Sequence, residues 1–274
     1  MYKGRYFNRS SVIVCGDYMD GDIYPVYQPA GRRRSRCRPT SKIQEKLNQR
    51  NAKKKLTRII HSNFREDDIA LHLTFRPDRN PATLKEARRE LRNFLGRLRR
   101  FYRKKGIVLK YIVVVEYGKR GGRVHFHLIL TGGVDRDELE KLWGNGYANS
   151  KRLQFDADGL TALANYITKD RVTYKRWSGS RNLIQPVPQV KDGAVTMGDM
   201  EEMRDAIDSR NAHAYFERQY PGFELTKAVC TQNGVNRGWY IHFEMRRKPG
   251  RPRGAKALKA PRAALHTRRG NGGK

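Results

Sequence analysis

A β-hairpin over residues 108–130 is the feature that most constrains how this chain can fold. Residues 108–117 form a mostly apolar run, residues 118–122 (GKRGG) have the composition of a turn, and residues 123–130 (RVHFHLIL) form a second apolar run. Two such runs joined by a short glycine-rich segment predict a pair of antiparallel strands. The second run is apolar on both faces over most of its length, which is typical of a strand buried inside a domain.

Two histidines in the second strand form a candidate metal site. His125 and His127 are two residues apart, so their side chains point to the same face of a strand. Glu116 lies near the end of the first strand, where the tight turn brings it opposite or diagonal to His125. A carboxylate that ends the apolar run 112–115 is costly to bury without a compensating partner, and a cation supplies one. The competing interpretation is that both histidines are hydrogen-bonded residues of an ordinary sheet.

The donor set indicates which ion such a site would hold. Two imidazoles and one carboxylate suit Mn²⁺, Zn²⁺, Fe²⁺ or Ni²⁺ better than Mg²⁺, which prefers oxygen ligands. His72, in a separate apolar run, is a possible further ligand, although a surface or hydrogen-bonded histidine is the simpler interpretation.

A candidate nucleophile, Tyr166, lies some 40 residues downstream. It falls in a predicted helix over residues 159–169, and Lys169 shares its face because it is three residues away. A tyrosine hydroxyl has a pKa near 10 and is a weak nucleophile, but a neighbouring ammonium and a metal-polarised phosphate both assist it. Because the chain has 14 tyrosines, an amphipathic core tyrosine is the alternative.

The order of predicted elements over residues 69–170 is strand, helix, strand, strand, helix, strand, helix. This order predicts an α+β fold in which an antiparallel sheet carries helices on one face, as in ferredoxin-like and RNA-recognition-like domains. The strand 69–75 is expected to lie beside the strand that carries His125 and His127. The other elements are helices over 81–105 and 135–143 and a strand over 150–155, with a break at 144–146.

The flanks are expected to form separate segments. Residues 12–15 and 23–24 read as two short strands around Asp20 and Gly21, and residues 41–61 read as a helix with a basic face. Further on, the sequence predicts one mixed-charge helix over 198–220 and a pair of strands over 224–232 and 238–245. The expected division is 1–62 (strands, basic arm and helix), 63–188 (the main domain), 189–245 (helix and strand pair) and 246–274 (a disordered basic tail).

Charge indicates nucleic acid as the partner. The chain has 58 Lys and Arg against 27 Asp and Glu, a formal net charge of +31, and such an excess repels itself unless it meets a polyanion. A membrane partner is discounted, because the sequence has no long apolar span and no basic helix with a large apolar face. The three cysteines show no zinc-site spacing and are expected to be thiols of a reducing compartment.

Basic and aromatic side chains outside the hairpin are candidate DNA contacts. Residues 31–38 form a basic run without acids, residues 171–183 interleave cations with aromatics, and residues 248–254 resemble an AT-hook. The alternatives are solvated loops and a generic basic tail. The residues expected to bind DNA are Arg32, Arg33, Arg34, Arg123, Lys175, Arg176, Trp177, Arg181, Arg251 and Arg253.

Three motifs in this order resemble those of the HUH endonucleases, specifically the rolling-circle replication initiators of small phages and plasmids. Residues 71–75 (LHLTF) resemble the first motif, His125-Phe126-His127 the second, and Tyr166-x-x-Lys169 the third. Glu116 matches the usual position of an additional metal ligand. Residues 175–183 and 38–40 also resemble the filamentous-phage gene II type, and the resemblance spans about residues 31–188.

The resemblance implies a metal-dependent endonuclease and strand transferase. Tyr166 would attack a phosphate of single-stranded origin DNA, leaving a 5′-phosphotyrosine and a free 3′-hydroxyl, and a second transfer would rejoin the ends. Lys169 would neutralise charge near the phosphotyrosine, and His125, His127 and Glu116 would hold a divalent ion, Mg²⁺ or Mn²⁺ ahead of Zn²⁺. A second catalytic tyrosine one helical turn away is absent, since Ala162 and Asp170 occupy those positions.

The remaining expectations concern partners and location. The partners are single-stranded DNA, the replication origin, and a host helicase and polymerase, with neither a membrane nor a small-molecule substrate. The chain has no Walker A motif and no signal-peptide core, so no helicase is fused and the expected location is the cytoplasm of a prokaryotic host. Two alternatives stay open: a metal-dependent phosphohydrolase without a covalent intermediate, and a non-catalytic nucleic-acid-binding module.

Overall fold

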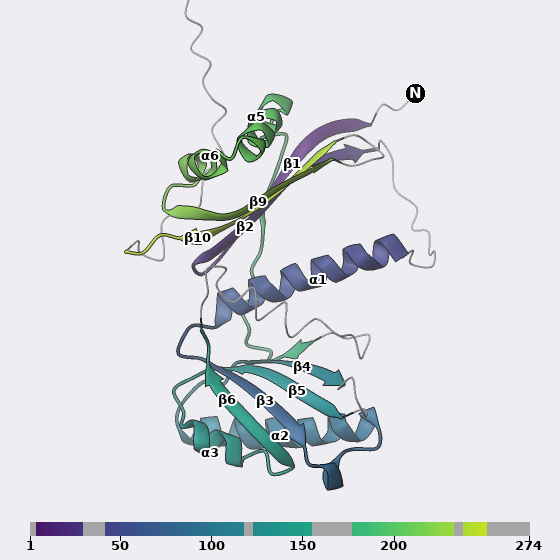
Figure 1. Cartoon of the computed structure of the whole chain (residues 1–274), viewed down its shortest axis with the longest axis vertical. Coiled ribbons are helices and arrows are strands. Elements are labelled where there is room, and N and C mark those ends of the chain that lie inside the picture. The colour runs from purple at the N-terminus through teal and green to yellow at the C-terminus, as the bar shows by residue number, and fades with distance from the viewer. Residues whose placement is uncertain (1–3, 30–41, 118–122, 155–176, 233–237, 251–274) are drawn as a thin grey trace, which may run out of the picture. The chain divides into compact units, whose positions relative to one another are not determined.

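The computed structural model describes residues 4–29, 42–117, 123–154, 177–232 and 238–250 (Figure 1). The chain divides into two compact units. The central unit is Thr40–Gln185, and the flanking unit combines Met1–Pro39 with Pro186–Lys274. Each is described by itself below.

The central unit contains a five-stranded antiparallel sheet with β5 in the middle, in the order β6-β3-β5-β4-β7. The predicted hairpin forms β4 and β5, and β3 pairs with β5 as expected. The α+β architecture with an antiparallel sheet is thereby confirmed. The strands are β3 (Ile69–Phe75), β4 (Tyr111–Tyr117), β5 (Val124–Leu130), β6 (Gly146–Arg152) and β7 (Ser178–Gly179).

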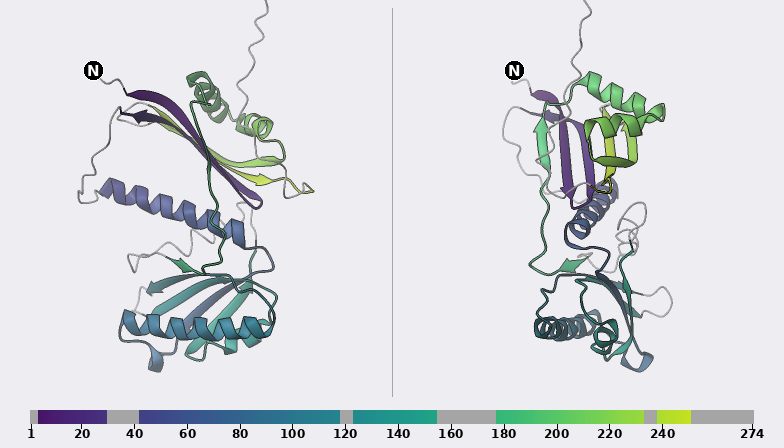
Figure 2. Two further views of the ribbon diagram at one scale, coloured as in Figure 1. Left: turned by 180° about the vertical axis from the view of Figure 1, so that it is seen from behind. Right: turned by 90° about the vertical axis from the view of Figure 1, so that its left-hand side faces the viewer.

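One face of this sheet packs against α2 (Leu84–Lys104) and α3 (Arg136–Lys141) (Figure 2). Alternate residues of β3, such as Leu71 and Leu73, point to this face and are almost fully buried. Phe126 lies between the two histidines in sequence but points the opposite way, into an edge-to-face aromatic cluster with Phe75 and Trp143. This packing holds β5 so that both of its histidines emerge on the other face.

α2 has clear sequence signals at both ends. Thr83 caps its N-terminus by accepting a hydrogen bond from the backbone N–H of Glu86. Gly106 follows its C-terminus with φ of +69°, the left-handed conformation that ends many helices and that glycine adopts without strain.

The opposite face of the sheet is partly covered by α1 (Lys42–Asn63). Leu56, Ile59 and Ile60 of α1 form one apolar cluster with Ile112 and Val114 of β4. The sequence predicted this helix and its bounds closely but placed it in a separate N-terminal segment. The structure adds it to the main domain as a second helical layer, because its apolar stripe is needed to bury the far side of β4.

The flanking unit is built around a second five-stranded antiparallel sheet, in the order β8-β1-β2-β10-β9. Two helices, α5 (Met197–Asp208) and α6 (Ala212–Gln219), cover one face of it, with Met200 and Phe216 in the core. Strands from both ends of the chain thus share one sheet, in contrast to the separate terminal segments expected from the sequence. The strands are β1 (Arg5–Cys15), β2 (Tyr18–Gln28), β8 (Gln189–Asp192), β9 (Phe223–Gln232) and β10 (Trp239–Arg247).

Two local predictions in the flanking unit were wrong. The turn between β1 and β2 lies at Gly16 and Asp17, with φ of +63° at Gly16, and not at Asp20 and Gly21. Gly21 is instead a strand residue on which the Phe243 ring packs, so that any side chain there would collide with the ring. The helix expected over 198–220 is interrupted at Arg210, whose φ of 64° is incompatible with a continuous helix.

Two further expectations concern thiols and membranes. Cys15 and Cys230 form no disulfide bond with another described residue, which agrees with the prediction of thiols, and Cys37 lies outside the described residues. Among the helices that the structure describes, none combines the length and apolarity needed to cross a bilayer.

Candidate active site

The histidine pair lies on the central strand of the sheet, between two strands that supply further polar side chains. On one side, Glu116 of β4 is directly opposite His125. On the other side, His72 of β3 is opposite His127, and Thr74 is opposite His125. All five side chains project to the face that α2 does not cover, because each belongs to the alternate set of its strand.

Hydrogen bonds connect these side chains across the strands. The Nε2 atom of His127 is 2.7 Å from Oε2 of Glu116, a half-buried pair whose side chains are 12% and 29% exposed. Nδ1 of His125 is 3.2 Å from Oγ1 of Thr74. The carboxylate expected to lie opposite or diagonal to His125 is thus opposite it in register and bonded diagonally to His127.

His72 is neither a surface residue nor a simple hydrogen-bonded one. Its ring stacks on both histidines of β5, with centroids 4.6 Å from His127 and 5.3 Å from His125. Burial lowers the pKa of His72 to about 4, and repulsion from the other two rings acts in the same direction. Burial also lowers the pKa of His125, although Glu116 opposes the shift.

The chemistry of the donor set fits a divalent metal ion. Burial and mutual repulsion favour the neutral imidazole, which is the form that binds metals, and Glu116 adds a carboxylate. The donor atoms are not gathered around one point, and among the described residues no group of three or more such side chains is arranged to hold an ion. His72 in particular lies nearly parallel to His127, at 12°, so its nitrogens do not converge on the point that His127 faces.

Comparison with known proteins identifies the part of the chain that contains this site. Residues 68–171 match the family model of replication-associated proteins of the ORF2 and gene II type. This segment is similar to that replication-associated family. The match covers just over a third of the chain, and it confirms the resemblance to HUH-type rolling-circle replication initiators. No curated protein and no solved structure matches the chain.

The replication-associated segment has one exposed aromatic residue near the site that the sequence did not indicate. Tyr147 of β6 pairs with Thr74 and is 68% exposed. Its neighbour on the same face, Asn149, pairs with His72. The sequence predicted the start of this strand at residue 150 and left Tyr147 between that strand and the break at 144–146, so no signal marked it. The alternation of side chains along β6 would have indicated it had the start of the strand been known.

The structure describes only some of the predicted DNA-binding and catalytic residues. Arg123 is exposed, two residues before His125, and its charge helps to lower the pKa of that histidine. Arg181 is exposed in the turn after β7, whereas Trp177 is partly buried against the cluster of α1 and β4. The remaining predicted residues lie outside the described residues: Tyr166, Lys169, Arg32, Arg33, Arg34, Lys175, Arg176, Arg251 and Arg253.

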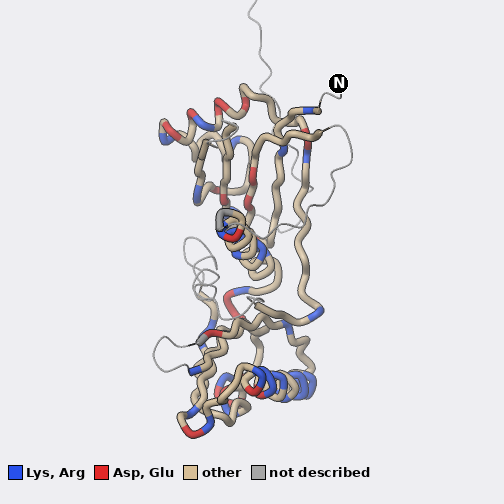
Figure 3. The backbone as a smooth tube through the Cα atoms, turned by 90° about the vertical axis from the view of Figure 1, so that its right-hand side faces the viewer, with Lys and Arg blue, Asp and Glu red and all other residues tan. Residues whose placement is uncertain are grey.

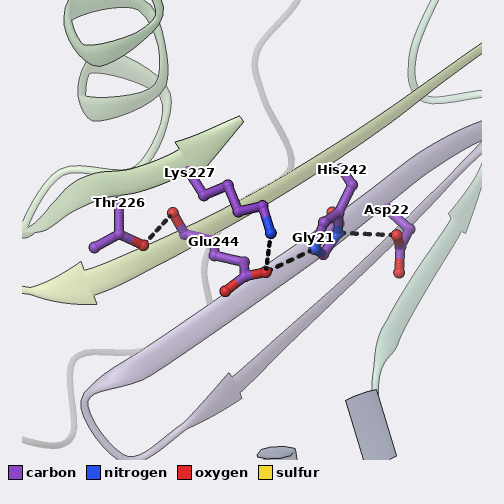
Figure 4. Close-up of polar contacts among 6 residues, drawn as sticks. All are labelled: Gly21, Asp22, Thr226, Lys227, His242 and Glu244. Atoms are coloured by element: carbon purple, nitrogen blue, oxygen red, sulfur yellow. Dashed lines mark hydrogen bonds and ion pairs between the residues drawn. The ribbon is translucent and has the colours of Figure 1, made fainter. Parts of the chain in front are cut away.

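A second histidine cluster, in the flanking unit, was also missed by the sequence analysis (Figure 4). Nδ1 of His242 on β10 is 3.0 Å from the Asp22 carboxylate, and its Nε2 is 3.1 Å from Glu244. Glu244 also lies 3.6 Å from Nζ of Lys227 on β9. The pairing of β2 with β10 brings His242 and Asp22 together. Because these residues come from opposite ends of the chain, their spacing in the sequence does not predict the contact.

Proposed function

We propose that this replication-associated protein nicks single-stranded origin DNA through a covalent tyrosine intermediate. The observation that carries the proposal is the placement of His125, His127 and Glu116 on one face of the sheet, inside the segment that matches the replication-associated family. Tyr166 and Lys169 fall within the same matched segment.

In this proposal His125, His127 and Glu116 hold a divalent metal ion. A bound Mn²⁺ or Mg²⁺ would polarise the target phosphate and offset the charge that develops on it. Glu116 would exchange its hydrogen bond to His127 for the ion. Thr74 would keep the His125 ring in its orientation through the bond to Nδ1.

The chain's own residues would then carry out the transfer. The Tyr166 hydroxyl oxygen attacks phosphorus and loses its proton, so that a tyrosine O–P bond forms as the P–O3′ bond breaks. The released 3′ oxygen takes up a proton and becomes the hydroxyl that primes synthesis. Lys169, three residues from Tyr166, would neutralise the phosphotyrosine, and the reverse attack by a 3′-hydroxyl would rejoin DNA ends.

The single strand would lie along this face, between β6 and the start of β5. Tyr147 offers an exposed ring on which a base can stack, and Arg123 offers a cation for the backbone. Both residues lie near His125. Tyr147 pairs with Thr74, which is opposite His125, and Arg123 is two residues before His125 in the sequence.

The decisive experiment is incubation of the full chain with single-stranded candidate origin DNA and Mn²⁺, followed by denaturing gel analysis. We expect a covalent protein–DNA adduct that Tyr166→Phe abolishes. Tyr27→Phe is the matched control, because it removes the same hydroxyl from an exposed tyrosine of the flanking unit and should leave the adduct unchanged.

Other outcomes would replace the proposal. Free cleavage products that survive Tyr166→Phe would indicate a metal-dependent phosphohydrolase without a covalent intermediate. DNA binding without cleavage under Mg²⁺, Mn²⁺ or Zn²⁺ would indicate a non-catalytic binding module. An adduct that is lost with Tyr174→Phe, and not with Tyr166→Phe, would move the nucleophile eight residues along the chain.

A further inference from the structure

The outer side of α2 carries a dense stripe of positive charge that the proposed chemistry does not use. Figure 3 shows it as the mostly blue helix at the bottom of the view. On α2 and at its C-cap, every exposed residue except Asn93 is a lysine or arginine. These exposed cations are Lys85, Arg88, Arg89, Arg92, Arg99, Arg100, Arg103, Lys104 and Lys105.

The spacing of these residues places most of them in one line along the helix. Successive members of one set are three, four or seven positions apart, so at 3.6 residues per turn they lie along one side of the helix. This set is Lys85, Arg88, Arg92, Arg99 and Arg103. Together with the adjacent Arg89 and Arg100, it covers roughly 120° of the helix circumference. The buried residues of α2, such as Leu91, occupy the opposite side. The stripe is therefore continuous, and at about 1.5 Å per residue it is roughly 30 Å long.

Two cations of the stripe have acidic partners: Arg89 lies 3.6 Å from Glu90, and Lys105 lies 2.8 Å from Glu138. Among the described residues, none forms an ion pair with Arg88, Arg92, Arg100 or Arg103. The two acidic residues of α2 also accept hydrogen bonds from groups outside the stripe. Glu86 accepts a hydrogen bond from the backbone N–H of Ala82, and Glu90 accepts one from Asn145.

The stripe and the candidate active site lie on opposite sides of the same sheet. α2 packs on the face that contains Leu71 and Phe126, whereas His72, His125 and His127 project from the other face. A short single strand seated at the histidines therefore cannot touch α2 through the sheet. This geometry separates the α2 face from any strand held at the histidines.

We propose that the α2 stripe binds the phosphate backbone of double-stranded DNA, independently of the strand held at the active site. The stripe follows one continuous helix, and its length is close to one turn of a B-form duplex, roughly 34 Å. None of the exposed residues of α2 is aromatic, so the stripe offers cations for phosphates but no surface for base stacking. The inference rests on the proposed function only in supposing that such duplex flanks the nicked site.

The test uses the full chain and two DNA probes, a 30-base-pair duplex without origin sequence and a short single-stranded origin oligonucleotide. Arg88→Glu with Arg92→Glu should weaken duplex binding about tenfold near 0.15 M salt and reduce the slope of log affinity against log salt by roughly 2. Adduct formation on the short single strand should stay unchanged. Arg65→Glu with Lys151→Glu is the matched control, since it removes two exposed cations elsewhere in the same unit.

Three results would overturn the proposal. One is an equal loss of duplex affinity in the control pair, which would reveal only a general charge effect. Another is an equal loss of single-strand binding in the variant with Arg88→Glu and Arg92→Glu, which would show that one surface binds both kinds of DNA. The third is binding to anionic phospholipid vesicles, but not to duplex, that depends on Arg88 and Arg92. Absence of any adduct with wild-type protein would count against the proposed function alone, because duplex binding is measured separately.

Discussion

The two sheets of this protein each carry strand histidines, on the face opposite α2 and α3 in one sheet and opposite α5 and α6 in the other, but the surroundings of these histidines differ. On the central unit, His72, His125 and His127 lie together with one carboxylate, Glu116. On the flanking unit, the single ring of His242 lies between two carboxylates.

The difference lies in what surrounds the ring nitrogens. Burial and the neighbouring rings lower the pKa values of His72 and His125, so the neutral form that can bind a metal ion is favoured. In the flanking unit, Nδ1 and Nε2 of His242 lie 3.0 and 3.1 Å from carboxylate oxygens, so both nitrogens already have acidic partners. A histidine on a strand is therefore a candidate ligand or a structural ion-pair partner according to the balance of rings and carboxylates around it.

The largest expected effect distinguishes the two clusters by activity. His127→Ala should slow formation of the covalent adduct at least about a hundredfold, because loss of metal binding removes several kcal/mol of transition-state stabilisation. His242→Ala should leave the rate within about twofold. The measurement is the rate of adduct formation on single-stranded DNA with Mn²⁺.

The comparison fails if the two variants lose activity equally. Circular dichroism checks that the His127→Ala protein is folded. If this folded variant still forms the adduct at the wild-type rate, the histidine pair is not part of the active site.

A smaller effect is expected for the carboxylates and can be measured without DNA. Glu116→Gln should weaken Mn²⁺ binding roughly tenfold or more, because it replaces a charged ligand by a neutral amide. Glu244→Gln makes the same change beside His242 and should leave Mn²⁺ affinity unchanged. Titration calorimetry with Mn²⁺ alone measures both variants, and a greater loss in Glu244→Gln would reverse the assignment of the two clusters.

The sequence predicted the half of the site that depends on local geometry. A short turn and the two-residue period of strands place His125, His127 and Glu116 on one face, and the structure has that arrangement. The neighbouring strand was also predictable, because the alternation in residues 69–75 leaves His72 and Thr74 on the face away from α2. The stacking of the His72 ring on His125 and His127 could not be predicted, because side-chain packing across strands follows no period in the sequence.

Non-local pairing set the limit of what the sequence could predict. β6 begins at Gly146, within what appeared to be a break, because this glycine lies against the backbone of Thr74 and Arg76 where a Cβ atom would not fit. The second sheet joins strands from the two ends of the chain. Each of its hairpins is a local feature, but the contact of β2 with β10 depends on a choice among strands that residue patterns do not encode.

The smallest expected effect concerns the stability of the stacked rings in acid. The pKa of His72 is about 4 in the folded protein against 6.5 for an ordinary histidine, so the unfolded chain takes up the proton first as the pH falls. The free energy of unfolding should therefore decrease between pH 6.5 and 4, by roughly 1 kcal/mol after allowance for partial solvent screening. His72→Gln removes the titrating ring and should flatten this decrease, and the remaining slope would include His125, whose pKa is lowered in the same direction. Urea unfolding in EDTA at several pH values measures the slope without metal, and an equal slope in His72→Gln and wild type would show that the stack does not disfavour protonation.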